Sequence, residues 1–206
     1  MATVHSQTIN NLLPTTLYHY RVLSRDASNN LATSADYMFT TSALPDTTAP
    51  IISNVQATNI TTSTVTITWT TNEASTTQTN YGLTSSYGYG STLDASLVTL
   101  HSVNITGLAA YTTYNYRVRS SDAANNEAIS VNHTFTTSNI SPNVDTFSAT
   151  PTSGVIPLIV NYSAIASDSD GYIAKYEWDF NGEGIYDQDT GSIAATSFTY
   201  SNAGSN

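Results

Sequence analysis

The sequence has 206 residues and a formal net charge of −10, with five lysine and arginine residues and no cysteine. So few basic side chains argue against a face that binds nucleic acid or an anionic membrane surface. The lack of cysteine excludes disulfides and thiolate chemistry. No apolar run reaches the length of a membrane span, so we expect no membrane insertion.

The composition favours strands over helices. Threonine and serine together contribute 62 residues, and tyrosine contributes another 14. Threonine, tyrosine, valine and isoleucine suit a pleated, half-buried surface, and no long stretch shows the apolar period of an amphipathic helix. The sequence therefore predicts an all-β chain.

The first predicted elements belong to an internal repeat. Residues 5–42 align without a gap with residues 101–138, and 20 of the 38 aligned positions are identical. A repeat with this offset indicates an array of whole domains rather than a solenoid. A unit of about 100 residues is the size of one antiparallel β-sandwich.

Strand patterns follow in chain order through the second copy. Apolar side chains alternate with threonines in TVTITWT, residues 64–70, and with polar residues in YNYRVRS, residues 114–120. A period of two places one set on the core face and the other toward water. The DAANN stretch, residues 122–126, is typical of a turn, and a last strand is predicted through residues 131–137.

One corner of the repeat resembles a known family. The run LAAYTTY, residues 108–114, resembles the Leu-x-Pro-x-Thr-x-Tyr segment of fibronectin type III domains, and the first copy keeps the proline at Pro14. The resemblance implies that the hydroxyls of Tyr18 and Tyr114 bond back to the backbone, and that Trp69 is the buried tryptophan of the second strand. Residues 80–88, NYGLTSSYG, also resemble the sandwich that precedes the catalytic domain of purple acid phosphatases.

These resemblances cover residues 1–138. They imply that residues 1–44 are the C-terminal part of a fibronectin type III-like domain and that residues 45–138 form a complete one. Because a half-sandwich is too small to bury a sufficient core, residues 1–44 should pack poorly or pair with another chain. We expect partial exposure of its apolar side chains, Leu12, Tyr20, Val22 and Phe39.

The last segment, residues 139–206, has a different pattern. It contains a Pro-x-Ser-Gly turn at residues 151–154, a strand predicted at 158–163, and the run YEWDFNGEG at 176–184. These motifs resemble a PKD domain, another small immunoglobulin-like β-sandwich. The family continues with further strands beyond YSNAG, so the resemblance implies a PKD-like domain that lacks its last strands.

Acidic residues in this last segment suggest calcium, which prefers several oxygen ligands. The first candidate site is Asp168 and Asp170 in the SDSDG loop, which binds calcium in some PKD domains. The second is the run Asp179, Asn181, Glu183 and Asp187, whose spacing imitates an EF-hand loop but lacks its helices and its last ligand. The alternative is that these residues form solvated turns.

Other candidate chemistry has weaker support in the sequence. His5 and His101 occupy equivalent repeat positions and do not converge, so we interpret the histidines as surface or cross-strand residues. Glu177 and Asp179 could share a strand face as paired carboxylates, without an evident pocket. No Gly-x-Ser-x-Gly elbow or Gly-rich phosphate loop occurs. We predict no catalytic residue and no enzymatic activity.

The stretch YGLTSSYGYG contains Tyr81, Tyr87 and Tyr89. Exposed tyrosines can stack on sugar rings, because their rings tolerate being half hydrated. The same tyrosines could instead pack on each other across the turn.

Three hypotheses for the function follow. The first is a non-enzymatic spacer or adhesion segment of a secreted or cell-surface microbial protein, with proline-containing linkers at residues 43–50 and 138–143. The second is an accessory region of a secreted hydrolase that tethers a catalytic domain to its substrate. The third is a decoration domain of a virion. All expect neighbouring domains, and a protein or polysaccharide surface as the ligand.

Overall fold

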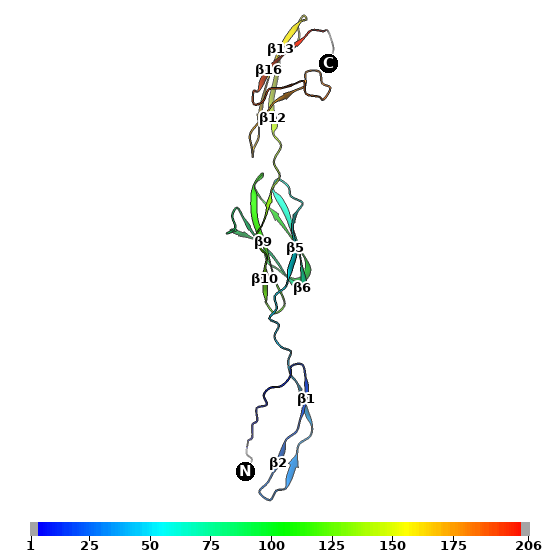
Figure 1. Ribbon diagram of the computed structural model, residues 1–206, viewed down its shortest axis with the longest axis vertical. Helices are drawn as coiled ribbons and strands as arrows, with labels where there is room; N and C mark the ends of the chain where they lie inside the picture. Colours follow the sequence, from blue (N-terminus) through cyan, green and yellow to red (C-terminus); the bar gives the residue numbers. More distant parts are fainter. Residues whose placement is uncertain (1–3, 203–206) are drawn as a thin grey trace. The chain divides into compact units, whose positions relative to one another are not determined.

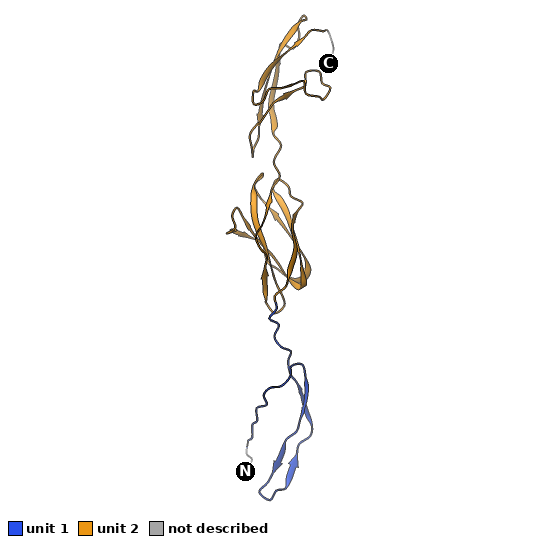
Figure 2. Cartoon of the chain, viewed as in Figure 1, with its two compact units in different colours: residues 1–48 blue, residues 49–206 orange. Residues whose placement is uncertain are grey.

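The computed structural model describes residues 4–202 of the chain, which divides into two compact units, residues 1–48 and residues 49–206 (Figure 2). Every regular element among the described residues is a β-strand, and all their pairings are antiparallel (Figure 1). Residues 4–202 contain no helix with the length and apolarity that a membrane crossing requires. The predicted all-β class of immunoglobulin-like sandwiches is confirmed.

Unit 1 is one long, two-stranded ribbon that is paired in two stretches. Strand β1 (Leu17–Tyr20) pairs with β4 (Tyr37–Thr40), and β2 (Leu23–Arg25) pairs with β3 (Leu31–Thr33). Aromatic rings stack across the first stretch. The exposure predicted for its apolar side chains is confirmed, because Val22 is 59% exposed and Phe39 is 36% exposed.

The first half of unit 2 is a sandwich built around one long strand, β6 (Thr64–Gly82). Its N-terminal part pairs with two strands and its C-terminal part with two others, so β6 contributes to both layers. The first layer consists of β5 (Ile52–Thr58), β6 and β8 (Asp94–Thr106). The second consists of β7 (Tyr89–Gly90), β6, β9 (Thr113–Ser121), β10 (Glu127–Ile129) and β11 (His133–Thr136).

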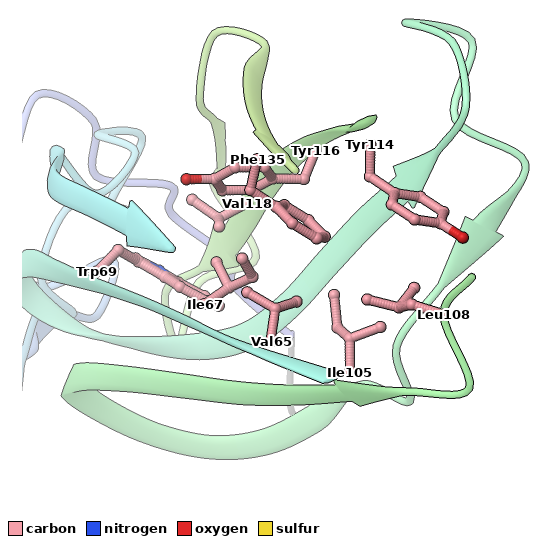
Figure 3. Packing of buried hydrophobic residues seen from close by; sticks show 9 residues of the cluster. All are labelled: Val65, Ile67, Trp69, Ile105, Leu108, Tyr114, Tyr116, Val118 and Phe135. Carbon is pink, nitrogen blue, oxygen red and sulfur yellow. The ribbon is translucent and has the colours of Figure 1, made fainter. Parts of the chain in front are cut away.

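The core of this sandwich lies between the two layers. Alternation places three side chains of TVTITWT, those of Val65, Ile67 and Trp69, in the core with at most 1% exposure. The opposing layer contributes alternate residues of β9 and one residue of β11 (Figure 3). These opposing side chains are Tyr114, Tyr116, Val118 and Phe135. The buried position predicted for Trp69 is therefore confirmed.

Both corner tyrosines make the hydrogen bond that the resemblance implied. The backbone N–H of Ala109 donates to the hydroxyl of Tyr114 at 3.0 Å. In the first copy the N–H of Leu13 donates to the hydroxyl of Tyr18 at 2.8 Å. The corner therefore has the same local geometry in both copies.

The second half of unit 2 contains a three-stranded sheet and a short hairpin. The sheet has the order β12 (Asn143–Thr150), β13 (Leu158–Ser167), β16 (Ala195–Tyr200), and the hairpin pairs β14 (Glu177–Trp178) with β15 (Gln188–Asp189). Three apolar side chains are buried here, Val160, Trp178 and Phe180. The hydroxyl of Tyr200 donates to the carbonyl of Phe180 at 2.9 Å and joins the sheet to the residues that follow β14.

Candidate functional site

The Asp168–Asp170 loop follows β13. The carboxylate of Asp170 accepts a hydrogen bond at 2.9 Å from the backbone N–H of Ile140, in the segment that leads into β12. Its other oxygen, Oδ1, is buried and has no hydrogen-bond partner among the described residues. Asp168 accepts a bond from the N–H of Asp170 at 3.3 Å, and its Oδ2 would lie 2.8 Å from a Cβ placed on Gly171. The loop therefore contains a desolvated carboxylate oxygen, which is the kind of ligand that a hard cation prefers.

The second acidic run, Asp179 to Asp187, forms the loop of the β14–β15 hairpin. The carboxylate of Asp179 accepts hydrogen bonds from the backbone N–H groups of Gly182 at 2.7 Å and Gly184 at 2.8 Å. These bonds from the loop backbone hold the pKa of Asp179 below its ordinary value. The carboxylate of Asp187 accepts a bond from the N–H of Phe180 at 2.7 Å. These two acids stabilise the loop itself, as expected of turn residues.

The carboxylates considered for acid–base chemistry have structural partners. Glu177 forms an ion pair with Lys175, which also lies near Asp189. The carboxylate of Asp179 accepts hydrogen bonds from the loop backbone. Both carboxylates therefore contribute to the stability of the β14–β15 hairpin.

His101 is the cross-strand histidine that lies in the core. His101 lies opposite Trp69, as a cross-strand residue should, but it is 3% exposed and not a surface residue. Its ring stacks on Trp69 with a centroid distance of 4.9 Å, and its two nitrogens contact the hydroxyls of Thr71 and Thr77 at 2.9 and 2.7 Å. Burial lowers the pKa of His101, because desolvation disfavours the charged imidazolium. This histidine is a buried core residue.

The three tyrosines of the YGLTSSYGYG stretch have different surroundings. Tyr81 and Tyr89 stack across β6 and β7 with a centroid distance of 5.5 Å. The guanidinium of Arg117 covers the ring of Tyr87 at 4.7 Å from the centroid. Packing across the turn is therefore confirmed for Tyr81 and Tyr89, whereas Tyr87 packs against Arg117 of β9. Tyr89 is still 62% exposed.

Sequence reasoning missed the groove beside these tyrosines. The structure brings Tyr81 and Tyr89 together with the end of β8 and the corner that follows it. The corner residues at this groove are Thr106, Gly107, Leu108 and Tyr114. The resemblance assigned the corner a structural role only, and no local pattern indicated that it would meet β7.

The sandwich matches one family model. Residues 52–137 match the model of the purple acid phosphatase N-terminal domain. That match covers β5 to β11, all the strands of the sandwich, and supports the class of fold alone.

Two bacterial enzymes are similar to longer parts of the chain. Chitinase A1 of Niallia circulans is 37% identical over 129 residues, which is 61% of this chain and 18% of that enzyme. Exoglucanase B of Cellulomonas fimi is 34% identical over 171 residues, which is 80% of this chain and 15% of that enzyme. The chain spans less than a fifth of the length of either relative.

Proposed function

We propose that this chain is a non-catalytic accessory region of a secreted microbial glycoside hydrolase, which works outside the cell. The observation that carries the proposal is the similarity to a chitinase and an exoglucanase, each over a minor part of the enzyme. The role fits the chemistry of the described residues, since Asp179 and Asp187 stabilise their own loop and His101 packs in the core. The chain would tether a neighbouring catalytic domain to a polysaccharide.

The spacer or adhesion hypothesis has less support than this one. Its physical basis is the stiff linkers and the succession of small sandwiches, which suit reach and display. An accessory region of a hydrolase has the same features. The names of the two relatives favour polysaccharide degradation, so spacing becomes part of the tethering role.

We propose three domains within the chain. Residues 1–44 belong to one fibronectin type III-like domain, residues 45–138 form a second, and residues 139–206 belong to a PKD-like domain. The repeat supports the first two. The sheet of β12, β13 and β16, and the buried Trp178 of the β14–β15 hairpin, support the third.

We also propose that Asp168 and Asp170 bind calcium. The buried, unpartnered Oδ1 of Asp170 supports this, because a cation would compensate its desolvation. Since Asp170 also holds the N–H of Ile140, a bound ion would stiffen the segment that enters β12. Calorimetric titration with calcium should give a saturable heat and a raised melting temperature.

A pair of variants makes the calcium test specific. The double variant Asp168→Ala/Asp170→Ala should lose both the heat and the stabilisation. Glu183→Ala, in the other acidic loop, should keep both. If Glu183→Ala loses the heat of calcium binding and the double variant keeps it, calcium binds in the β14–β15 hairpin loop instead. If the unchanged protein gives no heat, the calcium proposal is refuted.

The accessory role is tested on the parent polypeptide. An antibody raised against this chain should precipitate, from the culture medium of the source organism, a protein well above 22.0 kDa that releases sugar from cellulose or chitin. Peptide sequencing of that protein should find a catalytic domain beside the chain. A secreted protein made only of repeated β-domains, with no hydrolytic activity, would instead support the spacer hypothesis.

A further inference from the structure

A groove of about 160 Å³ lies at one end of the sandwich formed by residues 52–137. One wall is β7, whose Tyr89 pairs with Tyr81 of β6. The other wall is the end of β8 at Thr106 and the corner that begins at Gly107. The groove is lined by Tyr81, Tyr89, Thr106, Gly107, Leu108 and Tyr114.

The floor of the groove is the end of the apolar core. Leu108 is 8% exposed and Tyr114 is 7% exposed, and Figure 3 shows them side by side at one end of the buried cluster. Tyr81 packs against the same cluster. A ligand in the groove would therefore rest on a rigid, apolar base.

Tyr89 presents an open aromatic face on that base. Its ring stacks on Tyr81 with an interplanar angle of 26°, so one face is supported while the side chain remains 62% exposed. The turn before it is tightly built, because a Cβ on Gly82 would lie 1.8 Å from the carbonyl oxygen of Tyr87. The stack on Tyr81 and the pairing of β7 with β6 orient the ring of Tyr89.

The opposite wall is polar and uncrowded. Thr106 is exposed and supplies a hydroxyl. Gly107 has a φ of 73°, and a side chain placed on it would meet nothing within 4 Å. The lining contains no charged side chain. A flat aromatic face opposite hydroxyl and backbone groups suits a ligand that has an apolar face and a hydroxylated edge.

We propose that this groove binds one pyranose ring of a neutral polysaccharide, an assignment that rests on the proposed function. The C–H face of the sugar would stack on Tyr89 and its hydroxyls would meet Thr106 and the tyrosine hydroxyls. The net charge of −10 disfavours an acidic polysaccharide. Sites that enclose a whole ligand measure about 300–1,000 Å³, so this smaller groove takes one ring of a longer chain.

Two neighbouring tyrosines provide controls. Tyr111 is 65% exposed, nearly the same as Tyr89, but it does not line the groove. Tyr87 is covered by Arg117. If exposed tyrosine alone caused binding, Tyr111 would matter as much as Tyr89.

The test uses the full chain in affinity electrophoresis through gels that contain hydroxyethyl cellulose or glycol chitin. At least one gel should retard the unchanged protein. Tyr89→Ala should weaken the binding about three- to tenfold, the range expected for one lost ring contact. Tyr89→Phe should keep most of it and Tyr111→Ala all of it. Near-ultraviolet circular dichroism and thermal melting check that each variant stays folded.

The outcomes separate this proposal from the accessory role. If Tyr89→Ala and Tyr111→Ala weaken binding equally, or if neither weakens it, the groove is not the binding site. Other residues would then tether the polysaccharide. If neither gel retards the protein, the proposal that the groove binds sugar is refuted. The accessory role is tested separately, by the hydrolytic activity and sequence of the precipitated parent protein. Retardation in only one gel would identify glucose or N-acetylglucosamine as the sugar unit.

Discussion

The first and second copies of the repeat carry the same aromatic and aliphatic side chains at the same spacing but differ in burial. Tyr20 is 44% exposed, and its equivalent Tyr116 is 2% exposed. Val22 is 59% exposed, and its equivalent Val118 is not exposed at all. In the second copy these side chains face Val65, Ile67 and Trp69 of the opposing layer, which has no counterpart within residues 4–48.

The turns of the two copies, by contrast, are alike. The carboxylate of Asp26 accepts bonds from the backbone N–H and the side-chain amide of Asn30, each at 2.8 Å. Asp122 accepts the same two bonds from Asn126, also at 2.8 Å. Turn geometry therefore follows from neighbouring residues, whereas burial follows from strands that are distant in sequence.

The largest expected difference between the copies is in the loss of stability when the equivalent phenylalanines, Phe39 and Phe135, are replaced by alanine. Phe135→Ala should destabilise the sandwich by about 3–5 kcal/mol, because it leaves a cavity in the core. Phe39→Ala should change the same transition by less than about 0.5 kcal/mol. Denaturant titration followed by Trp69 fluorescence, in a Trp178→Phe background, measures both. Equal losses would show that the two copies share one cooperative core.

Substitutions of the two corner tyrosines should differ less in their effect on the free energy of unfolding. Tyr114→Phe removes a partner from the N–H of Ala109 and should cost about 0.5–1.5 kcal/mol. Tyr18→Phe removes the equivalent bond outside the sandwich and should leave the Trp69 transition unchanged. A Tyr114→Phe variant as stable as the unchanged protein would contradict the structural role of the corner.

His101 should make the stability of the second copy depend on pH. Its pKa is lowered in the fold by burial, so the unfolded chain binds a proton first as the pH falls below about 6.5. Stability should therefore be greatest above that pH and decrease as the pH falls toward 5, where most carboxylates are still ionised. His101→Gln should flatten this dependence, and His5→Gln should not. A melting temperature that is constant between pH 7.5 and 5 would refute the assignment.

The smallest difference between the copies is expected at the turns. Asp26→Ala and Asp122→Ala should each speed amide exchange at the asparagine four residues later, since each removes the acceptor of that N–H. The two increases should agree within about threefold. Nuclear magnetic resonance exchange rates at Asn30 and Asn126 measure this. A change at only one turn would show that burial also governs the turns.

The sequence predicted those features that depend on interactions between residues close together in the chain. The alternation in residues 64–70 and 114–120, the Asx turns and the tyrosine corners all appear where expected. It did not predict that β6 continues through both layers, because its second half buries Ser75, Thr77 and Thr79, and alternating polar residues carry no core signal. Ser75 and Thr77 can be buried there because their hydroxyls form hydrogen bonds with the ring of His101. The Oγ1 of Thr79 is buried without a hydrogen-bond partner among the described residues.

The candidate site was predicted in part for the same reason. Tyr81 and Tyr89 stood out because they are aromatic and close in sequence. Their groove depends on Gly107 and Leu108, which reach it only through the pairing of β6 with β8. The burial of His101 likewise depends on its register opposite Trp69. No local pattern specifies such contacts, whereas the folded sheets do.

Hydrogen exchange read by mass spectrometry on the intact chain tests most directly the claim that only the second copy has a covered core. Peptides from residues 17–25 and residues 113–121 can be compared in one sample, at a concentration where the protein is monomeric. The amides of residues 113–121 should exchange at least about a hundredfold more slowly than those of residues 17–25. Equal protection of the two segments would contradict the claim, because the ribbon of unit 1 would then be covered as well as the sandwich is.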